Sequence, residues 1–230
     1  MKTWVKICGL KTIDALDAAL DAGADYVGLV FFTKSPRNVS LEAAAPLAGL
    51  ARGRARIVAL TVDADDSVLT AIVEHVSPDV FQLHGTETRE RVAAIRQRYG
   101  REVWKAIAVA TPADAARAYD YVDFADRILF DAKPPADATL PGGNGLLFDW
   151  RALEGVRGKL DFMLSGGLTA GNVAEAIRAT SPWGVDVSSG VESAPGVKDP
   201  ALIGRFLRAV QGSGNGCPPA PGSGSSSDWS

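Results

Sequence analysis

The feature that most constrains the fold of this chain is a repeated unit, in which a short apolar run is followed by an alanine-rich amphipathic stretch. The unit recurs eight times between residues 4 and 210 of a 230-residue chain. Continuous apolar runs of this length predict parallel strands that are buried on both faces. Eight strand–helix units in one series favour a closed (β/α)8 barrel over an open sheet, and that barrel usually takes about 250 residues.

The units divide the chain into predicted elements. The predicted strands cover residues 4–8, 26–30, 56–61, 79–83, 103–107, 127–130, 162–164 and 184–187. The predicted helices cover residues 12–22, a segment that begins at 41, 66–75, 86–98, 112–119, a short segment near 149, 169–178 and 199–210. Thr12 and Ser40 are suited to the N-cap position, and Pro112 is suited to a first helical turn.

One domain over residues 1–211 is therefore predicted, followed by a tail over residues 212–230. The tail consists largely of Gly, Ser and Pro, which predicts disorder because such a segment has little apolar surface to bury. Cys217 lies in this tail and is expected to have no catalytic part.

Charge and cysteine content narrow the classes of function. The net charge of −3 gives no sign of a nucleic-acid partner. The chain holds only two cysteines, Cys8 and Cys217, without metal or redox spacing, which favours a reducing compartment and a cytoplasmic protein. No apolar run approaches the roughly 20 residues of a membrane helix. We therefore expect neither a membrane nor a nucleic acid among the partners of this chain.

Barrels of this class place their active sites at the carboxyl ends of the strands, so the residues that follow each strand are the candidates. Two glycine loops follow the seventh and eighth predicted strands, at residues 165–167 and 188–190. Glycine lets backbone N–H groups approach an anion closely. A single loop of this kind would be interpreted as a tight turn. Two such loops on adjacent strands predict a phosphate site, and the loop at 142–145 is a weaker candidate for covering it.

Two further strand ends carry reactive groups. Cys8 ends the first strand, where a thiolate could act as a base or nucleophile, although a lone cysteine on an apolar strand is more often a small core residue. Asp131 follows the apolar run 128–130, where burial could make its carboxyl group an acid. A solvated or helix-capping carboxylate is the alternative for Asp131.

Three polar residues complete the candidate set. Arg37 follows the second strand and could bind a substrate carboxylate through paired hydrogen bonds, or could simply be solvated. His84 could contact the ligand, or could be a packed strand-end histidine. Asp186 alternates with apolar neighbours on the eighth strand, so it is expected to point into the barrel, where a buried carboxylate needs partners.

Taken together, these segments resemble the phosphoribosylanthranilate isomerase family, whose motifs occur in the same order over residues 6–210. The start Lys-Ile-Cys-Gly at 6–9 and the end Asp-Val-Ser-Ser-Gly-Val-Glu at 186–192 are the most specific. The other matching stretches are 24–28, 35–37, 82–85, 142–145, 148–150 and 164–168.

The resemblance implies a ribulose-phosphate-binding (β/α)8 barrel that isomerises N-(5′-phosphoribosyl)anthranilate in tryptophan biosynthesis. It implies a monomer or homodimer that needs no metal or organic cofactor. The roles that it implies are these: Cys8 as general base, Asp131 as general acid, Arg37 on the anthranilate carboxylate, His84 and Asp186 lining the pocket, and Gly166, Gly167, Ser189, Gly190 and Gly143 at the phosphate.

Two rival functions remain open at this point. A related isomerase of histidine biosynthesis would be expected to carry an aspartate where Cys8 stands. A non-catalytic protein that binds a phosphorylated ligand would keep the glycine loops but would need neither Cys8 nor Asp131. Fold alone does not separate these functions, because this barrel hosts many chemistries.

Overall fold

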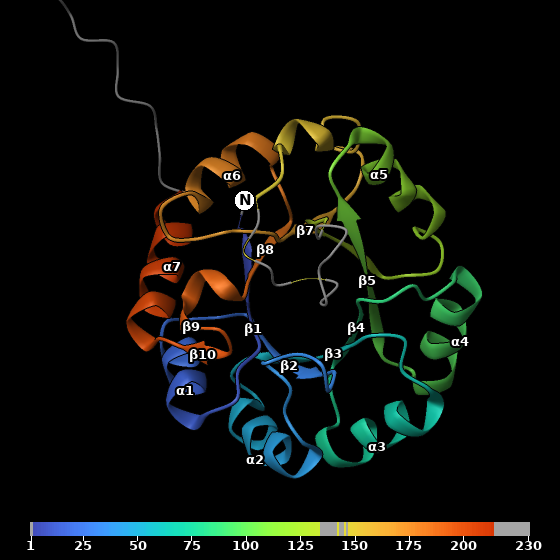
Figure 1. Cartoon of the computed structure of the whole chain (residues 1–230), viewed down its shortest axis with the longest axis vertical. Helices are drawn as coiled ribbons and strands as arrows, with labels where there is room; N and C mark the ends of the chain where they lie inside the picture. Colours follow the sequence, from blue (N-terminus) through green and yellow to red (C-terminus); the bar gives the residue numbers. More distant parts are fainter. Residues whose placement is uncertain (1, 134–141, 143–144, 146, 214–230) are drawn as a thin grey trace, which may run out of the picture.

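The computed structural model describes residues 2–133, 142, 145 and 147–213. Eight parallel strands close into a barrel in the order β1 to β8, so the predicted fold is confirmed. Figure 1 looks down the barrel and shows the helices as a ring around the strands. The strands are β1 (Trp4–Cys8), β2 (Tyr26–Phe31), β3 (Arg56–Thr61), β4 (Val80–Leu83), β5 (Glu102–Val109), β6 (Arg127–Ala132), β7 (Phe162–Leu164) and β8 (Gly184–Val187).

The helices alternate with the strands. They are α1 (Ile13–Asp21), α2 (Leu41–Ala51), α3 (Asp66–Val76), α4 (Arg89–Tyr99), α5 (Pro112–Ala116), α6 (Val173–Thr180) and α7 (Pro200–Ser213). The predicted caps are confirmed, because the hydroxyls of Thr12 and Ser40 accept hydrogen bonds from the amides of Ala15 and Ala43. Pro112 opens α5, as predicted.

Several helices differ from the prediction. The helix after β5 changes to a 3₁₀ turn, η1 (Arg117–Asp120), and the helix after β6 is only a 3₁₀ turn, η2 (Trp150–Leu153). The helix α6 begins at Val173, later than the predicted residue 169, because Thr169 and Asn172 form a hydrogen-bonded turn first. The helix α7 continues past the predicted barrel end at residue 211, and the predicted tail lies, from residue 214, outside the described residues.

The secondary structure between β8 and α7 was not predicted. This segment forms a 3₁₀ turn, η3 (Ser189–Val191), and a small antiparallel hairpin of β9 (Glu192–Ala194) and β10 (Val197–Lys198). The hairpin lies against the loop after β2, where the place of a Cβ on Gly196 would be 2.5 Å from the carbonyl oxygen of Pro36. The last loop of the barrel is thereby packed onto one of the first.

Side chains fill the barrel in layers because residues two apart on a strand share a face. The outward face of the strands and the helices form the main hydrophobic core. An inward cluster fills the end where the strands begin, hereafter the floor, and it consists of Tyr26, Val58, Val80, Trp104, Ala106, Leu129 and Met163. A second, smaller inward cluster of Cys8, Val30 and Leu60 lies at the opposite end, hereafter the mouth.

No helix in the described part of the chain is both long and apolar enough to span a bilayer.

Candidate active site

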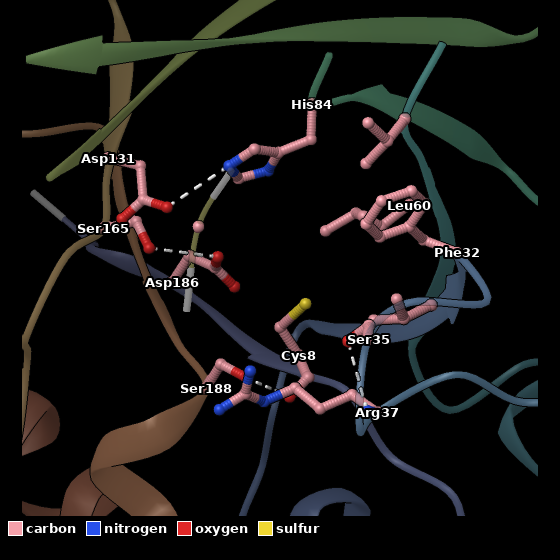
Figure 2. A pocket seen from close by; sticks show the side chains of 13 residues that line it. Cys8, Phe32, Ser35, Arg37, Leu60, His84, Asp131, Ser165, Asp186 and Ser188 are labelled. Atoms are coloured by element: carbon pink, nitrogen blue, oxygen red, sulfur yellow. Dashed lines mark hydrogen bonds and ion pairs between the residues drawn. The ribbon is translucent and has the colours of Figure 1, made fainter. Parts of the chain in front are cut away.

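A pocket lies at the mouth of the barrel, lined by residues of several strands and loops. It brings together five of the residues that the sequence singled out, although they come from different strands and loops. These residues are Cys8, Arg37, His84, Asp131 and Asp186. Phe32, Leu60 and Val62 supply an apolar wall. Figure 2 shows the Cys8 sulfur pointing into this pocket, with Asp131 and His84 on the far side.

Cys8 is buried and lies on the inward face of β1, two residues after Lys6. Burial raises the pKa of the Cys8 thiol, since it disfavours the thiolate. The positive charges of Lys6 and Lys198 oppose this rise, whereas the Asp186 carboxylate adds to it. The protonation state of Cys8 is therefore decided by the charged groups packed around it.

Asp186 on β8 is the main partner of Lys6. Parallel pairing of β1 and β8 places the two residues in register, and Lys6 Nζ donates to Asp186 Oδ1 at 2.9 Å. The other oxygen, Oδ2, accepts from the hydroxyl of Ser165 at 3.3 Å. Burial would lower the pKa of Lys6, but the charges of Asp186 and Cys8 outweigh it and raise that pKa. The expectation that Asp186 points inward and is paired is met, and its partner Lys6 was not a candidate.

Asp131 occupies the opposite wall, on the inward face of β6. Its Oδ2 lies 3.2 Å from His84 Nε2, and its Oδ1 accepts from the amide of Ala132 at 2.9 Å. The second ring nitrogen of His84, Nδ1, lies 3.1 Å from Gln82 Nε2. Asp131 is therefore a buried carboxyl group with a histidine contact, and the alternative of a solvated or helix-capping carboxylate does not describe it.

Arg37 reaches the pocket from the loop after β2 and is held by Glu192 of β9. Its Nε and Nη2 atoms donate to the two carboxylate oxygens of Glu192, each at 2.8 Å. Lys198 of β10 donates to the same carboxylate at 2.6 Å. Burial would raise the pKa of Glu192, but the hydrogen bonds and charges of Arg37 and Lys198 lower it below its usual value. The alternative of a simply solvated Arg37 is wrong, because the side chain is buried.

Lys198 is itself buried, and its ammonium also donates to the carbonyl oxygen and the hydroxyl of Ser188. The Ser188 hydroxyl in turn donates to the carbonyl oxygen of Cys8 at 3.1 Å. Burial lowers the pKa of Lys198, although Glu192 counteracts it. Sequence reasoning missed Glu192 and Lys198. Only Glu192 had a signal, since it ends the motif at 186–192.

A second, smaller pocket opens beside the first, and the two share Asp131, Ser165, Asp186 and Ser188. The glycine loops after β7 and β8 line it with Gly166, Gly167 and Ser189. Gly166 and Gly167 have positive φ, +91° and +62°, and within the described part of the chain neither amide donates a hydrogen bond. Two amides at the edge of a pocket can bind an anion.

The structure gives Gly190 a packing role. A Cβ at this position would lie 1.8 Å from the carbonyl oxygen of Leu168, so only glycine lets the two loops approach this closely. Gly190 does not line the second pocket. Gly143, the remaining predicted phosphate residue, lies outside the described residues. Among the described residues, no group of three or more His, Cys, Asp and Glu side chains could hold a metal ion.

Comparisons with known proteins agree with this arrangement. A family model described as N-(5′phosphoribosyl)anthranilate (PRA) isomerase matches residues 5–209. The N-(5′-phosphoribosyl)anthranilate isomerase of Rhodopseudomonas palustris (strain ATCC BAA-98 / CGA009) is 58% identical over 211 residues, which are 92% of this chain and 99% of that protein. The protein of the same name from Rhizobium meliloti is 55% identical over 92% of this chain and 98% of that protein.

Solved structures give the same result at lower identity. The phosphoribosyl anthranilate isomerase of Thermotoga maritima superposes on this chain with a TM-score of 0.83 at 34% sequence identity. The match covers 91% of this chain and 99% of the Thermotoga maritima chain. A phosphoribosyl anthranilate isomerase in complex with reduced 1-(o-carboxyphenylamino)-1-deoxyribulose 5-phosphate gives a TM-score of 0.80 at 33% identity, with the same coverage.

Proposed function

The chain belongs to the N-(5′-phosphoribosyl)anthranilate isomerase family, and on that premise we propose that Cys8 and Asp131 are the base and the acid of its reaction. The enzyme converts N-(5′-phosphoribosyl)anthranilate to 1-(o-carboxyphenylamino)-1-deoxyribulose 5-phosphate in tryptophan biosynthesis. The observation that carries the assignment of roles is the single pocket lined by the Cys8 thiol and the Asp131 carboxyl group. These groups come from β1 and β6, on opposite walls of the barrel.

The proposed reaction is an Amadori rearrangement in which both groups move protons. Asp131, in its protonated form, gives a proton to the ribose ring oxygen while the bond from that oxygen to C1′ breaks. The lone pair of the anthranilate nitrogen forms a C1′–N double bond. The Cys8 thiolate then removes the proton from C2′, and the electron pair forms a C1′–C2′ double bond. Protonation of C1′ and loss of the C2′ hydroxyl proton give the amino-ketone.

This scheme needs no cofactor, because the substrate nitrogen accepts the electron pair that a cofactor would otherwise accept. Each positioned acid or base contributes about 10²–10⁴-fold, or roughly 3–5 kcal/mol. The remainder of the rate enhancement comes from holding the substrate in a reactive orientation.

The other predicted residues supply that orientation. Arg37 lines the wall next to Cys8, and the Glu192 carboxylate fixes its guanidinium, so Arg37 is suited to bind the anthranilate carboxylate. The amides of Gly166 and Gly167, with Ser189, are suited to bind the phosphate in the adjoining pocket. The ribose then spans the shared wall formed by Ser165, Asp186 and Ser188.

We also propose a cytoplasmic location, because Cys8 is a free thiol and works as a base only while it is reduced. We propose either a monomer or a homodimer, since the described residues of one chain already bring Cys8 and Asp131 into one pocket. A Thermotoga maritima relative is described as a dimeric protein from which monomers were generated. Light scattering on the purified protein distinguishes the two states.

The direct test is the fluorescence-monitored consumption of N-(5′-phosphoribosyl)anthranilate by the purified protein. Turnover is expected with this substrate and not with the substrate of the related histidine-pathway isomerase, since that enzyme is expected to have a carboxylate where Cys8 stands. An Arg37→Ala variant is expected to raise KM with little change in kcat. Tight binding of the substrate without turnover would overturn the proposed function in favour of a binding protein.

A further inference from the structure

Two lysines that the proposed chemistry does not use lie buried beside Cys8. The side chain of Lys6 is 0% exposed and that of Lys198 is 2% exposed. Lysine is rarely buried unless it is paired, because taking an ammonium group out of water is costly. The burial of two ammonium groups at the mouth of the barrel therefore needs an explanation, and Cys8 is the group that both lysines adjoin.

The two ammonium groups differ in their partners. Lys198 donates to Glu192 and to both oxygens of Ser188, so its three hydrogens have three acceptors. Lys6 Nζ has one oxygen acceptor among the described residues, Asp186 Oδ1 at 2.9 Å. The Lys6 ammonium group therefore has N–H donors that are not used by an oxygen acceptor among the described residues, and these donors can bind a sulfur atom.

The Cys8 sulfur is the neighbouring atom that can accept a hydrogen bond from the Lys6 ammonium group. Lys6 and Cys8 are two residues apart on β1 and share its inward face. On the adjacent strand β2, the place of a Cβ on Gly28 would be 3.1 Å from Cys8 Sγ and 3.1 Å from Lys6 Cε. The lysine stem and the sulfur therefore lie on either side of the same small gap, which stays open because residue 28 is glycine.

We propose that Lys6 is a positioning residue whose ammonium group, anchored by Asp186, serves as the counter-ion of the Cys8 thiolate. With Cys8 protonated, the positive charge of Lys6 is balanced by Asp186. When Cys8 loses its proton, the same ammonium faces two anions and stabilises both. This inference rests on the proposed role of Cys8 as the base, and it explains how a buried thiol is able to lose its proton.

The other charges around Cys8 do not replace Lys6. Lys198 and Arg37 lie on the hairpin side, where both are paired with the Glu192 carboxylate. His84 and Asp131 lie on the opposite wall of the pocket and contact each other. On β2 the inward neighbours are uncharged. Asp186 on β8 disfavours the thiolate unless Lys6 compensates it.

The test follows the ionisation of Cys8 through its rate of alkylation by iodoacetamide as a function of pH. All proteins carry Cys217→Ser, which removes the only other thiol of the chain. Because the thiolate is the reactive form, the midpoint of the rate profile reports the ionisation of Cys8 directly. This measurement does not depend on catalysis.

Two substitutions with opposite expected signs separate charge from general loosening. Lys6→Gln is expected to move the midpoint to higher pH and to slow alkylation near neutral pH by about tenfold or more. Asp186→Asn is expected to move the midpoint to lower pH, because it removes an anion and leaves the ammonium to Cys8. The matched control is Lys105→Gln. It removes a buried lysine that donates to Glu87 and to the carbonyl oxygens of Leu83 and Gly85, away from Cys8, and should leave the midpoint unchanged.

An unchanged midpoint in Lys6→Gln would overturn the proposal, as would a rise in the Lys105→Gln control. If Lys6→Gln does not fold, Asp186→Asn decides alone, since an unchanged or higher midpoint in that variant contradicts the counter-ion role. The rising limb of kcat/KM against pH should move together with the alkylation midpoint. Full activity of Cys8→Ala would instead overturn the base assignment and leave the alkylation result standing, so the two failures are distinguishable.

Discussion

The floor and the mouth of this barrel are built on the inward faces of the same strands, yet they differ completely in chemistry. At the floor, Trp4 stacks on Trp183 with ring centroids 5.5 Å apart, and Tyr26 packs edge-on against Trp104 at 5.0 Å. At the mouth, the same strands present a thiol and carboxyl groups to the pocket, and the Lys6 ammonium group is bound to one of these carboxyl groups. The change takes place within β1, whose inward residues are Trp4, Lys6 and Cys8 in that order.

The difference shows that depth along a strand, rather than the strand itself, decides what a side chain does. The floor is filled by packed side chains, among them large rings that stabilise it by burial and by ring–ring contacts. At the mouth the main charged groups are paired between strands or loops, as in Lys6 with Asp186, Asp131 with His84 and Arg37 with Glu192. We therefore expect floor substitutions to change stability without changing the chemistry, and substitutions of the reacting groups to do the reverse.

The largest effect is expected at the reacting groups of the mouth. Cys8→Ala and Asp131→Asn should each lower kcat by about 10²–10⁴-fold, because each removes a proton-transfer group. The change in KM and in Tm should be small by comparison. Steady-state kinetics and thermal unfolding of the same preparations measure both. A Cys8→Ala protein that works at the full rate would contradict the division between mouth and floor.

At the floor, Trp104→Ala should reduce the free energy of unfolding by about 3–5 kcal/mol, because it empties a fully buried site. At temperatures where the variant is folded, its kcat should match that of the parent. Chemical denaturation followed by tryptophan fluorescence or circular dichroism gives the stability. The control is Tyr119→Ala, an exposed aromatic residue for which we expect a change within about 0.5 kcal/mol. A large loss of kcat in folded Trp104→Ala would break the comparison.

The expected effect of Glu192→Gln is smaller than that of the substitutions at the reacting groups and at the floor. Glu192 holds Arg37 and Lys198 but does not contact the reacting atoms. The variant should lose about 1–3 kcal/mol of stability at neutral pH, because two buried cations lose their anion. The folded-state pKa of Glu192 lies below its usual value of 4.5, so the stabilisation is complete above about pH 4.5 and fades as the pH falls through the folded-state pKa. Tm measured against pH should show the gap between parent and variant closing in acid.

The smallest effect is expected at Asp114, a charged residue on the rim of the mouth with no part in the pocket. It forms a capping box with Thr111 at the start of α5 and an ion pair with Lys133. Burial would raise its pKa, but hydrogen bonds from Ala110, Thr111 and Lys133 lower it to about 2.

Asp114→Asn should cost about 1 kcal/mol, as the loss of a cap does, with kcat unchanged. The difference in Tm should be present above about pH 3.8 and vanish toward pH 2, since the folded-state pKa is depressed. A variant with altered kcat would show that position at the rim is enough to affect the reaction.

The sequence was sufficient for the fold and for the residues that meet at the mouth. Short apolar runs locate strands because both faces of a barrel strand are buried, and the rule that active sites lie at the carboxyl ends of strands selects Cys8, Arg37, His84 and Asp131. The helix after β6 was not predictable as a 3₁₀ turn, because the same Asp149 cap that begins an α-helix also begins the turn at Trp150.

The partners of these residues were not predictable. Lys6 lies in the middle of β1 and would be discounted by a rule that searches only strand ends, and its partner Asp186 is 180 residues away in the chain. Arg37 and Glu192 are separated by 155 residues. Periodicity indicates which face of a strand a residue occupies, but it carries no information about the residue on another strand that it meets. The β9–β10 hairpin, which supplies Glu192 and Lys198, is too short for a periodic signal.

The large distance along the chain between Cys8 and the charged groups packed around it matters during synthesis of the enzyme. A ribosome synthesises Cys8 and Lys6 almost at once, but Asp186, Glu192 and Lys198 only near the end of the domain. Until that late stretch emerges, Lys6 has no Asp186 to anchor it beside the thiol, and Arg37 has no Glu192 carboxylate to hold it. Nascent chains that stop before residue 186 should therefore be inactive however well their first strands have formed, and activity should appear in one late step of translation rather than by degrees.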